Sequence, residues 1–497
     1  MKVKTKIIAA FLLLCLCLPL VVACNNTEST NTGVGGDVVT AAPGEDPNKI
    51  LEVPEDVTFD GYEFTFFVGT NVTTCPHIFE ADSESDNAVD QAIYERNLTI
   101  ETKYDITIEE KYVQKDNVSG YGAAYTELSR VIDAGDMLYD AAVASTYDCG
   151  TLSQNDYIVN LRNYGYVNLN KVWWDQAANE QLTIYGRTYF TAGDISYIDD
   201  NFTYAITFNK DMALEHNIGD LYQLVEDGKW TYDKLYEYSK KVSNQDNING
   251  FSEGDVYGFL GYNDTIWMAF SSIGSNIAAV NEKGELALTL NTEKNMNHIT
   301  KWTEFGQDPS FVNWQTDEAA NATGWAKVYS NKQAFFFGAT IDGIYKLRNL
   351  EIDYGFLPWP KADEGQELYH SGMSPNHISL FCIPNYPAAT QTEIDRTSIL
   401  VEALAHGSSI VIEGFYEKNL QGKGVRDDES YATLDIIFAN KVFDQGFYYN
   451  VGKYRGKMST NFRTGDVNFG SFYKEQEEIA IGEINKINKL YQGLLSE

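Results

Sequence analysis

Apolar and polar residues in the first third of the chain follow a pattern that predicts strands and helices in turn. Period-two apolar positions in YEFTFFVG (62–69) predict a strand, and DITIEE (105–110) predicts a second one. Residues 87–104 and 123–135 carry apolar side chains at helical spacing. YDAAVAS (139–145) is a short apolar run, typical of a strand buried on both faces. This βαβαβ order predicts an α/β fold with a parallel sheet covered by helices.

The carboxyl end of the third predicted strand is the first candidate binding position. Ligands of parallel α/β sheets bind beyond the carboxyl ends of the strands. In this chain Tyr147 and Asp148 follow directly after Ser145 and Thr146. We therefore expect Tyr147 and Asp148 to contact a ligand.

A separate apolar run, Ile7–Ala23, lies at the N-terminus. Three lysines precede it and no acidic residue occurs before Glu28, which is the layout of a secretory signal. The run is slightly short for a spanning helix of about 20 residues and contains Pro19, so a transmembrane anchor is the less favoured alternative. It ends in VVAC, which resembles the bacterial lipobox. This resemblance implies a signal peptide over residues 1–23 and a diacylglycerol group on Cys24.

Residues 24–56 are predicted to form a flexible tether. No aromatic residue occurs from Asn25 to Thr58, and such a segment cannot bury enough apolar surface to offset the entropy lost on ordering. The folded part is therefore expected to begin near Val57. It is longer than a single core usually supports, so two lobes are expected.

Composition limits the ligands and the covalent chemistry. Lys and Arg number 37 against 71 Asp and Glu, which gives a formal net charge of −34. Nucleic-acid binding, which requires clustered basic residues, is excluded, and a strongly anionic ligand is disfavoured. Beyond the signal and Cys24, the cysteines are Cys75, Cys149 and Cys382. Three thiols do not form a disulfide framework, although one pair could form.

Five segments resemble, in the same order, parts of bacterial extracellular solute-binding proteins of ABC importers, in particular the sugar-binding branch. They are YDAAVASTYD (139–148), GRTYFTAGDISYIDDNFTYAITFNKDM (186–212), DGKWTYDKLYEYSKKV (227–242), YSNKQAFFFGATIDGIYKLRNLEIDYGFLPWPK (329–361) and VEALAHGSSIVIEGFYEKNL (401–420). The resemblance implies a two-lobed, periplasmic-binding-protein-like (type II) fold with a hinge between the lobes. It also implies that the protein is not an enzyme, and that it captures a small solute, such as a carbohydrate or oligosaccharide, for an ABC import permease.

The resemblance also implies where the lobes begin and end. Lobe one is expected over 57–195 and 338–378, and lobe two over 196–337 and 379–497. The chain is expected to cross between them near Ala192–Asn201 and near Phe336–Gly338. Closure of the two lobes around a ligand would remove the ligand from water. The mature protein is expected to be a monomer, anchored by lipid at the extracellular face of the cytoplasmic membrane.

Candidate ligand-binding residues follow from the chemistry of a sugar site. Aromatic rings cover the apolar faces of pyranoses, and carboxylates accept hydroxyl protons. Besides Tyr147 and Asp148, the candidates are Trp173, Asp194, Trp267, Thr340, Asp342 and Trp359. The alternative for each tryptophan is a core position, and for each aspartate a helix cap or turn.

No cofactor, metal ion or catalytic residue is predicted. Residues 244–255 resemble a calcium loop, but Gln245 and Val256 stand where its first and last acidic ligands would be. Two other functions stay open. A lipid-anchored glycoside hydrolase would need two carboxyl groups at a set separation, which sequence spacing does not reveal. A binding lobe that feeds a membrane sensor would have the same sequence features.

Overall fold

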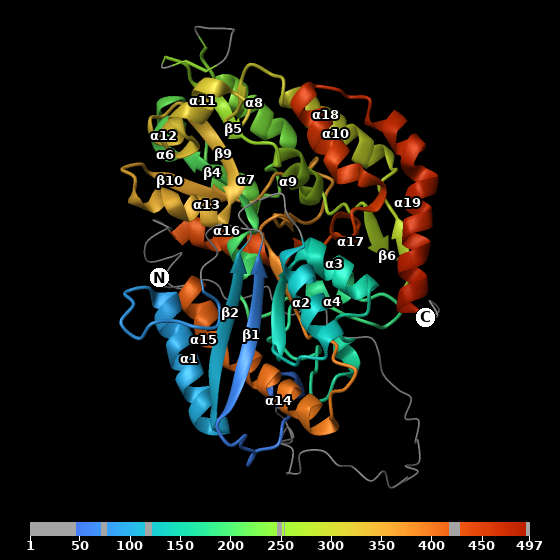
Figure 1. Cartoon of the computed structure of the whole chain (residues 1–497). Coiled ribbons are helices and arrows are strands. Elements are labelled where there is room, and N and C mark those ends of the chain that lie inside the picture. The colour runs from blue at the N-terminus through green and yellow to red at the C-terminus, as the bar shows by residue number, and fades with distance from the viewer. Residues whose placement is uncertain are drawn as a thin grey trace, which may run out of the picture.

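The computed structural model describes residues 46–70, 77–114, 122–245, 251–252, 254–416 and 428–493. The predicted signal peptide, Cys24, Cys75 and half of the calcium-like loop lie outside these residues. The described chain folds around two separate sheets, each with its own helices, which we call lobe one and lobe two. In Figure 1 lobe one is the lower half and lobe two is the upper half.

Lobe one contains the sheet predicted from the sequence. Its strand order is β12-β3-β1-β2, with bounds β1 Tyr62–Thr70, β2 Ile106–Gln114, β3 Ala141–Ser145 and β12 Ser379–Cys382. β1 is parallel to both β2 and β3, as the βαβαβ pattern predicted. β12 is antiparallel to β3 at the sheet edge.

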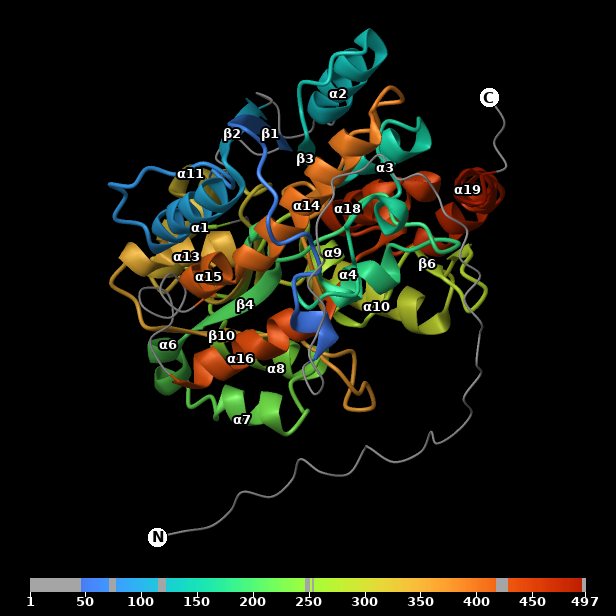
Figure 2. The same ribbon diagram turned by 90° about the horizontal axis from the view of Figure 1, so that it is seen from below.

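Helices cover the faces of this sheet. They are α1 (Ala88–Tyr104), α2 (Ala123–Ala134), α3 (Thr146–Gln154), α4 (Gln176–Gln181), α14 (Gln391–Gly407) and α15 (Ser409–Glu413). α1 packs against α14 and α15 (Figure 2), although some 300 residues separate them in the chain. α14 begins at Thr390, whose hydroxyl accepts from the Glu393 N–H while the Glu393 carboxylate accepts from the Thr390 N–H. This reciprocal capping fixes where the helix starts.

Lobe two contains a five-stranded mixed sheet of order β10-β4-β9-β5-β8. The strands are β4 (Tyr204–Asn209), β5 (Tyr257–Gly261), β8 (Phe311–Asn313), β9 (Ala334–Thr340) and β10 (Tyr354–Leu357). The surrounding helices are α6 (Lys210–Glu215), α7 (Leu221–Glu226), α8 (Tyr232–Val242), α9 (Thr265–Ser272), α10 (Glu293–Phe305), α11 (Glu318–Thr323), α12 (Trp325–Ser330), α13 (Ile341–Tyr345) and α16 (Asp428–Ala439).

Two small sheets from the middle and end of the chain and three C-terminal helices complete the structure. Two-stranded sheets pair β6 (Ala278–Val280) with β7 (Leu286–Leu288) and β11 (Ser371–Gly372) with β13 (Lys441–Val442). The helices are α17 (Gln445–Tyr448), α18 (Tyr454–Thr464) and α19 (Phe469–Tyr491). Short 3-10 turns lie at η1 (Pro47–Lys49), η2 (Leu161–Asn163), η3 (Lys346–Asn349) and η5 (Val451–Lys453). α18 packs on α9 and α10, so this part belongs to lobe two.

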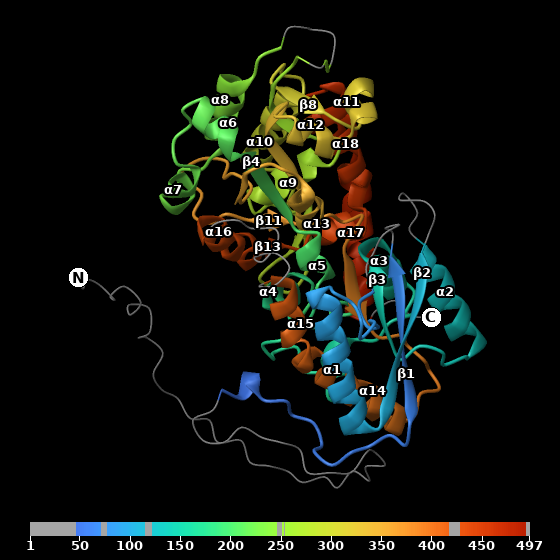
Figure 3. The same ribbon diagram turned by 90° about the vertical axis from the view of Figure 1, so that its left-hand side faces the viewer.

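The first crossing lies at the predicted place. Thr191 still forms a bridge with Phe381 of lobe one, whereas β4 of lobe two begins at Tyr204. The short helix α5 (Ile198–Asn201) lies between these points (Figure 3).

The predicted second crossing near Phe336–Gly338 is wrong. Those residues belong to β9, which is hydrogen-bonded to β4 on one side and β5 on the other. Three consecutive phenylalanines favour such a central, fully buried strand. The chain returns to lobe one only between β10 and β12, so β10 belongs to lobe two, and β12, α14 and α15 belong to lobe one. The lobe boundaries predicted after residue 338 are corrected accordingly.

The two crossings lie side by side and form the hinge. Thr203 and Met373 form an antiparallel bridge, and the Ser374 N–H donates to the Phe202 carbonyl at 3.0 Å. The Ser371 N–H also donates to the carbonyl of Asn440, directly before β13. Three segments that are distant in sequence therefore meet between the lobes.

Among the described residues, one stretch is long and apolar enough to cross a membrane. It runs from Gln391 to Tyr416, and 67% of its most apolar window is buried inside the protein. Such burial is typical of the core helix of a globular lobe.

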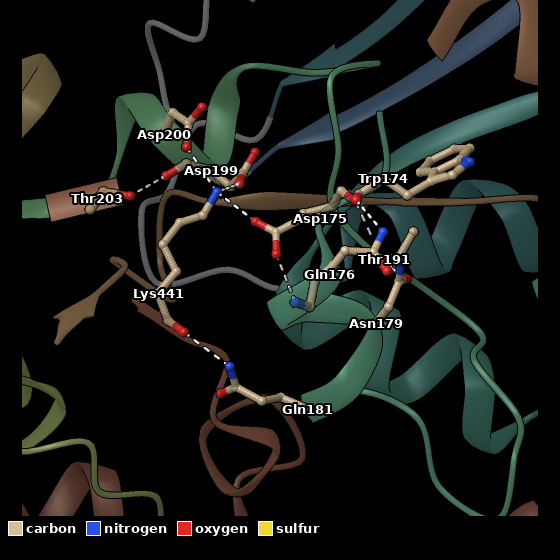
Figure 4. A network of polar contacts seen from close by, with 12 residues as sticks. Trp174, Asp175, Gln176, Asn179, Gln181, Thr191, Asp199, Asp200, Thr203 and Lys441 are labelled. Atoms are coloured by element: carbon tan, nitrogen blue, oxygen red, sulfur yellow. Dashed lines mark hydrogen bonds and ion pairs between the residues drawn. The ribbon is translucent and has the colours of Figure 1, made fainter. Parts of the chain in front are cut away.

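A buried ion cluster ties the hinge together (Figure 4). The Lys441 ammonium lies 2.7 Å from Asp175, 2.7 Å from Asp199 and 2.8 Å from Asp200, and the lysine side chain is only 9% exposed. Asp175 caps α4 of lobe one, whereas Asp199 and Asp200 belong to α5 in the first crossing. The cluster therefore joins lobe one, the crossing and β13.

Asp194, a predicted ligand residue, lies half-buried beside this cluster. Burial, and then the neighbouring Asp200 and Asp199 carboxylates, raise the pKa of Asp194 to about 7. The structure thus places Asp194 in the electrostatic surroundings of Lys441.

We predict that Lys441→Met lowers the free energy of unfolding by about 3 kcal/mol at neutral pH, because it leaves buried carboxylates without their cation. The loss should shrink on acidification, since protonation of those carboxyl groups removes their charge. Urea unfolding at pH 5 and pH 7.5 measures both effects.

The matched control is Lys346→Met, which removes an exposed ion pair to Asp342 with an N–O distance of 2.7 Å. Its cost should be below about 0.5 kcal/mol. Equal losses in the two variants would contradict a special role for the buried cluster.

Candidate functional site

The facing edges of the two sheets determine where a ligand can touch both lobes. In lobe one, Ser145 at the end of β3 lies opposite Ser379, where β12 begins after the return crossing. In lobe two, Tyr204 at the start of β4 lies opposite Thr340 at the end of β9. β5 is parallel to β9, so its last residue, Gly261, lies at the same edge. Segments that follow β3 and β5 therefore meet between the lobes.

A chain of polar contacts links these two segments through the hinge. The Tyr147 hydroxyl, after β3, donates to Asn376 Oδ1 at 3.1 Å. Asn376 Nδ2 in turn donates to Asp264 Oδ2 at 3.4 Å, and Asp264 follows β5. The Arg455 guanidinium of α18 lies 3.6 Å from the centre of the Tyr147 ring. We call Tyr147, Asp264, Asn376 and Arg455 the interlobe site.

Asp264 is the group of this site with the most unused binding capacity. Burial raises its pKa to about 7, and only the hydrogen bond from Asn376 acts in the opposite direction. An ionised carboxylate can accept about four hydrogen bonds. Within the described residues, the Asp264 carboxylate accepts one, from Asn376 Nδ2 at 3.4 Å. Asp264 is therefore suited to accept hydrogen bonds from ligand hydroxyl groups.

Aromatic side chains stand next to Asp264. Tyr262 follows β5, and Trp314 follows β8, which is parallel to β5. Their ring centres are 6.4 Å apart with an interplanar angle of 49°. Burial raises the pKa of Tyr262 well above its ordinary value, and the Asp264 charge raises it further. The phenol therefore stays protonated at neutral pH and can donate a hydrogen bond.

Three predicted residues lie at or near this site. Tyr147 is one of its members. Trp267 lies directly behind, because its indole N–H donates to the Arg455 carbonyl at 3.0 Å. Thr340 lies at the facing edge of lobe two and caps α13. Asp342, two residues further on, is paired with Lys346. Ligand contacts by these residues remain predictions.

Three other predicted residues have structural positions instead. The Asp148 carboxylate caps α2, accepting from the Gly122 N–H at 2.5 Å and the Ala124 N–H at 3.1 Å. Trp359 is fully buried, with its ring centre 5.4 Å from that of Trp302. These are the cap and core alternatives that the sequence left open.

Trp173 has a structural position as well. Its indole N–H donates to Glu402 at 2.9 Å, and the Trp174 indole N–H donates to the same carboxylate at 2.8 Å. Burial raises the pKa of Glu402 to about 7. The adjacent tryptophans thus anchor α14 and do not face the other lobe.

Sequence reasoning missed Asp264, Asn376 and Arg455. A signal existed for Asp264, because YGFLG (257–261) is an apolar run and Asp264 stands just beyond its end, as Tyr147 does after β3. No local pattern marks Asn376 or Arg455, which reach the site only through the hinge and α18. Among the residues that the structure describes, no group of three or more His, Cys, Asp or Glu is arranged to hold a metal ion.

The raised pKa of Asp264 predicts a pH-dependent stability. Its carboxyl group titrates near 3.8 when unfolded and at about 7 when folded. Between these values the unfolded chain binds fewer protons, so the free energy of unfolding falls as the pH rises. Asp264→Asn removes this contribution. Between pH 5 and pH 7, the free energy of unfolding of the variant should therefore fall by about 1 to 2 kcal/mol less than that of the wild type.

Urea unfolding across this pH range measures the difference. Asp233→Asn is the control, because the Asp233 side chain is 74% exposed on α8. It should follow the wild-type pH profile. If Asp264→Asn also follows it, the Asp264 carboxylate is not buried as described.

Comparison with solved structures identifies the fold, whereas comparison by sequence finds no relative. Neither protein-family models nor curated proteins match this sequence. Among solved structures, an ABC substrate-binding protein of Listeria monocytogenes in complex with cycloalternan superimposes with a TM-score of 0.54 at 13% identity. That match covers 86% of this chain and 100% of the other.

Two further solved structures have a similar fold. A sugar transporter protein of Rhizobium etli in an open conformation has a TM-score of 0.53 at 12% identity, covering 87% of this chain and 99% of the other. A maltose/maltodextrin-binding domain of Bdellovibrio bacteriovorus bound to maltotriose has a TM-score of 0.52 at 12% identity, covering 85% and 100%. The chain therefore has the two-lobed α/β fold of periplasmic binding proteins of type II, the fold of the sugar-binding proteins of ABC importers.

Proposed function

We propose that this protein captures a neutral oligosaccharide between its lobes and delivers it to an ABC import permease. The observation that carries the proposal is the contact chain from Tyr147 through Asn376 to Asp264. A ligand bound there would touch lobe one, the hinge and lobe two together. Its binding would therefore favour the closed arrangement of the lobes.

The chemistry of the interlobe site favours a hydroxyl-rich, uncharged ligand. Asp264 supplies a carboxylate acceptor, and Tyr147 and Asn376 supply neutral polar groups. Tyr262 and Trp314 offer flat apolar faces of the kind that cover pyranose rings. The formal net charge of −34 further disfavours anionic solutes. Of the three solved structures compared above, one is in complex with cycloalternan, one is bound to maltotriose, and one is a sugar transporter protein.

Binding without turnover fits this site better than hydrolysis. A glycoside hydrolase uses two carboxyl groups that flank the scissile bond. The interlobe site as defined contains one carboxyl group, that of Asp264. We therefore assign Asp264 to ligand binding, and recovery of intact sugar in the test below distinguishes this role from acid–base catalysis.

Export and lipid anchoring complete the proposed role. The signal-like run, the lipobox-like VVAC and the polar tether support a protein held at the extracellular face of the cytoplasmic membrane, near a permease.

We predict that Cys24→Ser abolishes incorporation of labelled palmitate and releases the protein into the medium. Labelled, membrane-bound Cys24→Ser protein would contradict the lipid anchor at Cys24.

Delivery of the ligand to a membrane sensor is the alternative to delivery to a permease. Loss of sugar uptake when the protein is deleted would favour the permease over the sensor.

The binding test uses the mature protein and a panel of neutral oligosaccharides. Some members should raise the melting temperature by mass action, and the recovered sugar should be intact by mass spectrometry. Asp264→Ala should raise the dissociation constant about tenfold or more, because hydrogen bonds to a charged acceptor are lost. Asp233→Ala, on the outer surface of lobe two, should bind as the wild type does. Hydrolysed sugar, or wild-type affinity in Asp264→Ala, would overturn the proposal.

A further inference from the structure

A second cavity lies in lobe one, at the end of the first sheet opposite the interlobe site. Its lining includes Tyr62, the first residue of β1, and Tyr139, which stands just before β3. Tyr164 and Tyr386 complete a set of four tyrosines. We call this set, with Arg396 of α14, the tyrosine pocket. Its volume of about 430 Å³ lies in the range of small-molecule sites.

The pocket holds one charged donor, the Arg396 guanidinium, beside a buried carboxylate. The Asp140 carboxylate is satisfied, because it accepts from the Tyr62 hydroxyl at 2.8 Å and from the Thr65 N–H at 2.9 Å. The Arg396 guanidinium stacks 3.6 Å from the centre of the Tyr62 ring. Its Nε atom is enclosed by protein, whereas the Arg396 side chain as a whole is only partly buried and lines the cavity. The guanidinium carries five N–H donors, so it can also donate to an oxygen atom supplied by a ligand.

The charges of the pocket favour a neutral ligand. Two carboxylates, Asp140 and Glu393, lie near the single guanidinium of Arg396 and offset its charge. An anion would therefore gain little from Arg396. Burial raises the pKa of Tyr164 to about 12, so its hydroxyl keeps its proton at neutral pH.

The aromatic wall of the pocket is held in place before any ligand binds. Tyr386 stands between Pro384 and Pro387, and its hydroxyl accepts from the Tyr139 N–H at 3.3 Å. Proline restricts the backbone, and an ordered side chain loses little freedom on binding. Fixed aromatic faces beside polar groups match the alternating apolar faces and hydroxyl edges of a pyranose.

We propose that the tyrosine pocket is a second saccharide-binding site, which holds a neutral pyranose unit of a glycan. The sugar ring lies against the tyrosines, and one of its hydroxyl oxygens accepts from the Arg396 guanidinium. β3 separates this pocket from the interlobe site, and its 5 residues span about 17 Å. The second site does not depend on the proposed function of the first.

The test separates the two sites by mutation. Mature protein carrying Asp264→Ala is titrated with neutral hexose oligosaccharides on a glycan array and by calorimetry. We expect two binding phases, one that Asp264→Ala weakens and one that it leaves unchanged. The unchanged phase should weaken about tenfold or more when Arg396→Gln is added, since a charged hydrogen bond is lost. The matched control is Arg348→Gln, because Arg348 also stacks on a tyrosine, 3.5 Å from the ring centre of Tyr345, but in lobe two. It should not change the remaining binding.

A second variant protects the test against misfolding. Met137 lines the pocket and is 40% exposed, so Met137→Trp should fill the cavity without disturbing the core. It should remove the binding phase that Arg396→Gln weakens and leave the phase that Asp264→Ala weakens, while the melting temperature of the protein is kept. Absence of any binding in Asp264→Ala, binding only of anionic glycans, or equal effects of Arg396→Gln and Arg348→Gln would overturn the proposal.

Discussion

The enclosure of one ammonium group by three carboxylates is the interaction on which the arrangement of the lobes depends. Lys441 meets Asp175, Asp199 and Asp200 at hydrogen-bond distance, and these residues come from lobe one, the first crossing and β13. Buried charges are tolerated only when they are paired. The pairing therefore restricts how the three segments can lie, while the neighbouring backbone contacts, such as Thr203 with Met373, complete the hinge.

Buried carboxyl groups recur through the protein, and their partners separate structural from binding roles. Asp148 accepts backbone N–H groups of α2, and Glu402 accepts two indole N–H groups. Asp444 accepts from the Ile277 N–H at 2.7 Å and from the Gly446 N–H at 2.8 Å. Within the part of the chain that the structure describes, the Asp264 carboxylate accepts from one side chain, at 3.4 Å. Its unused acceptor capacity, at the facing edges of both lobes, is what distinguishes a proposed binding group from a cap.

In the proposed function, the position of the interlobe site would couple ligand binding to closure of the lobes. Asn376 lies in the return crossing, so the residue that joins Tyr147 to Asp264 is itself part of the hinge. A ligand that adds hydrogen bonds on both sides of Asn376 gains them only when the lobes are close. Such differential affinity is the requirement for a ligand to shift a conformational equilibrium.

The sequence by itself determined the local elements and the class of the fold. Period-two and buried apolar runs predicted β1, β2 and β3 as parallel strands, and Tyr147 followed from the strand-end rule. Tertiary structure alone decided the rest. β12 completes the first sheet from more than 200 residues away, and Asp264, Asn376 and Arg455 converge only after both crossings are made. The physical reason is that periodicity reports which face of an element is buried, whereas strand order, capping partners and the pairing of charges depend on contacts between distant segments.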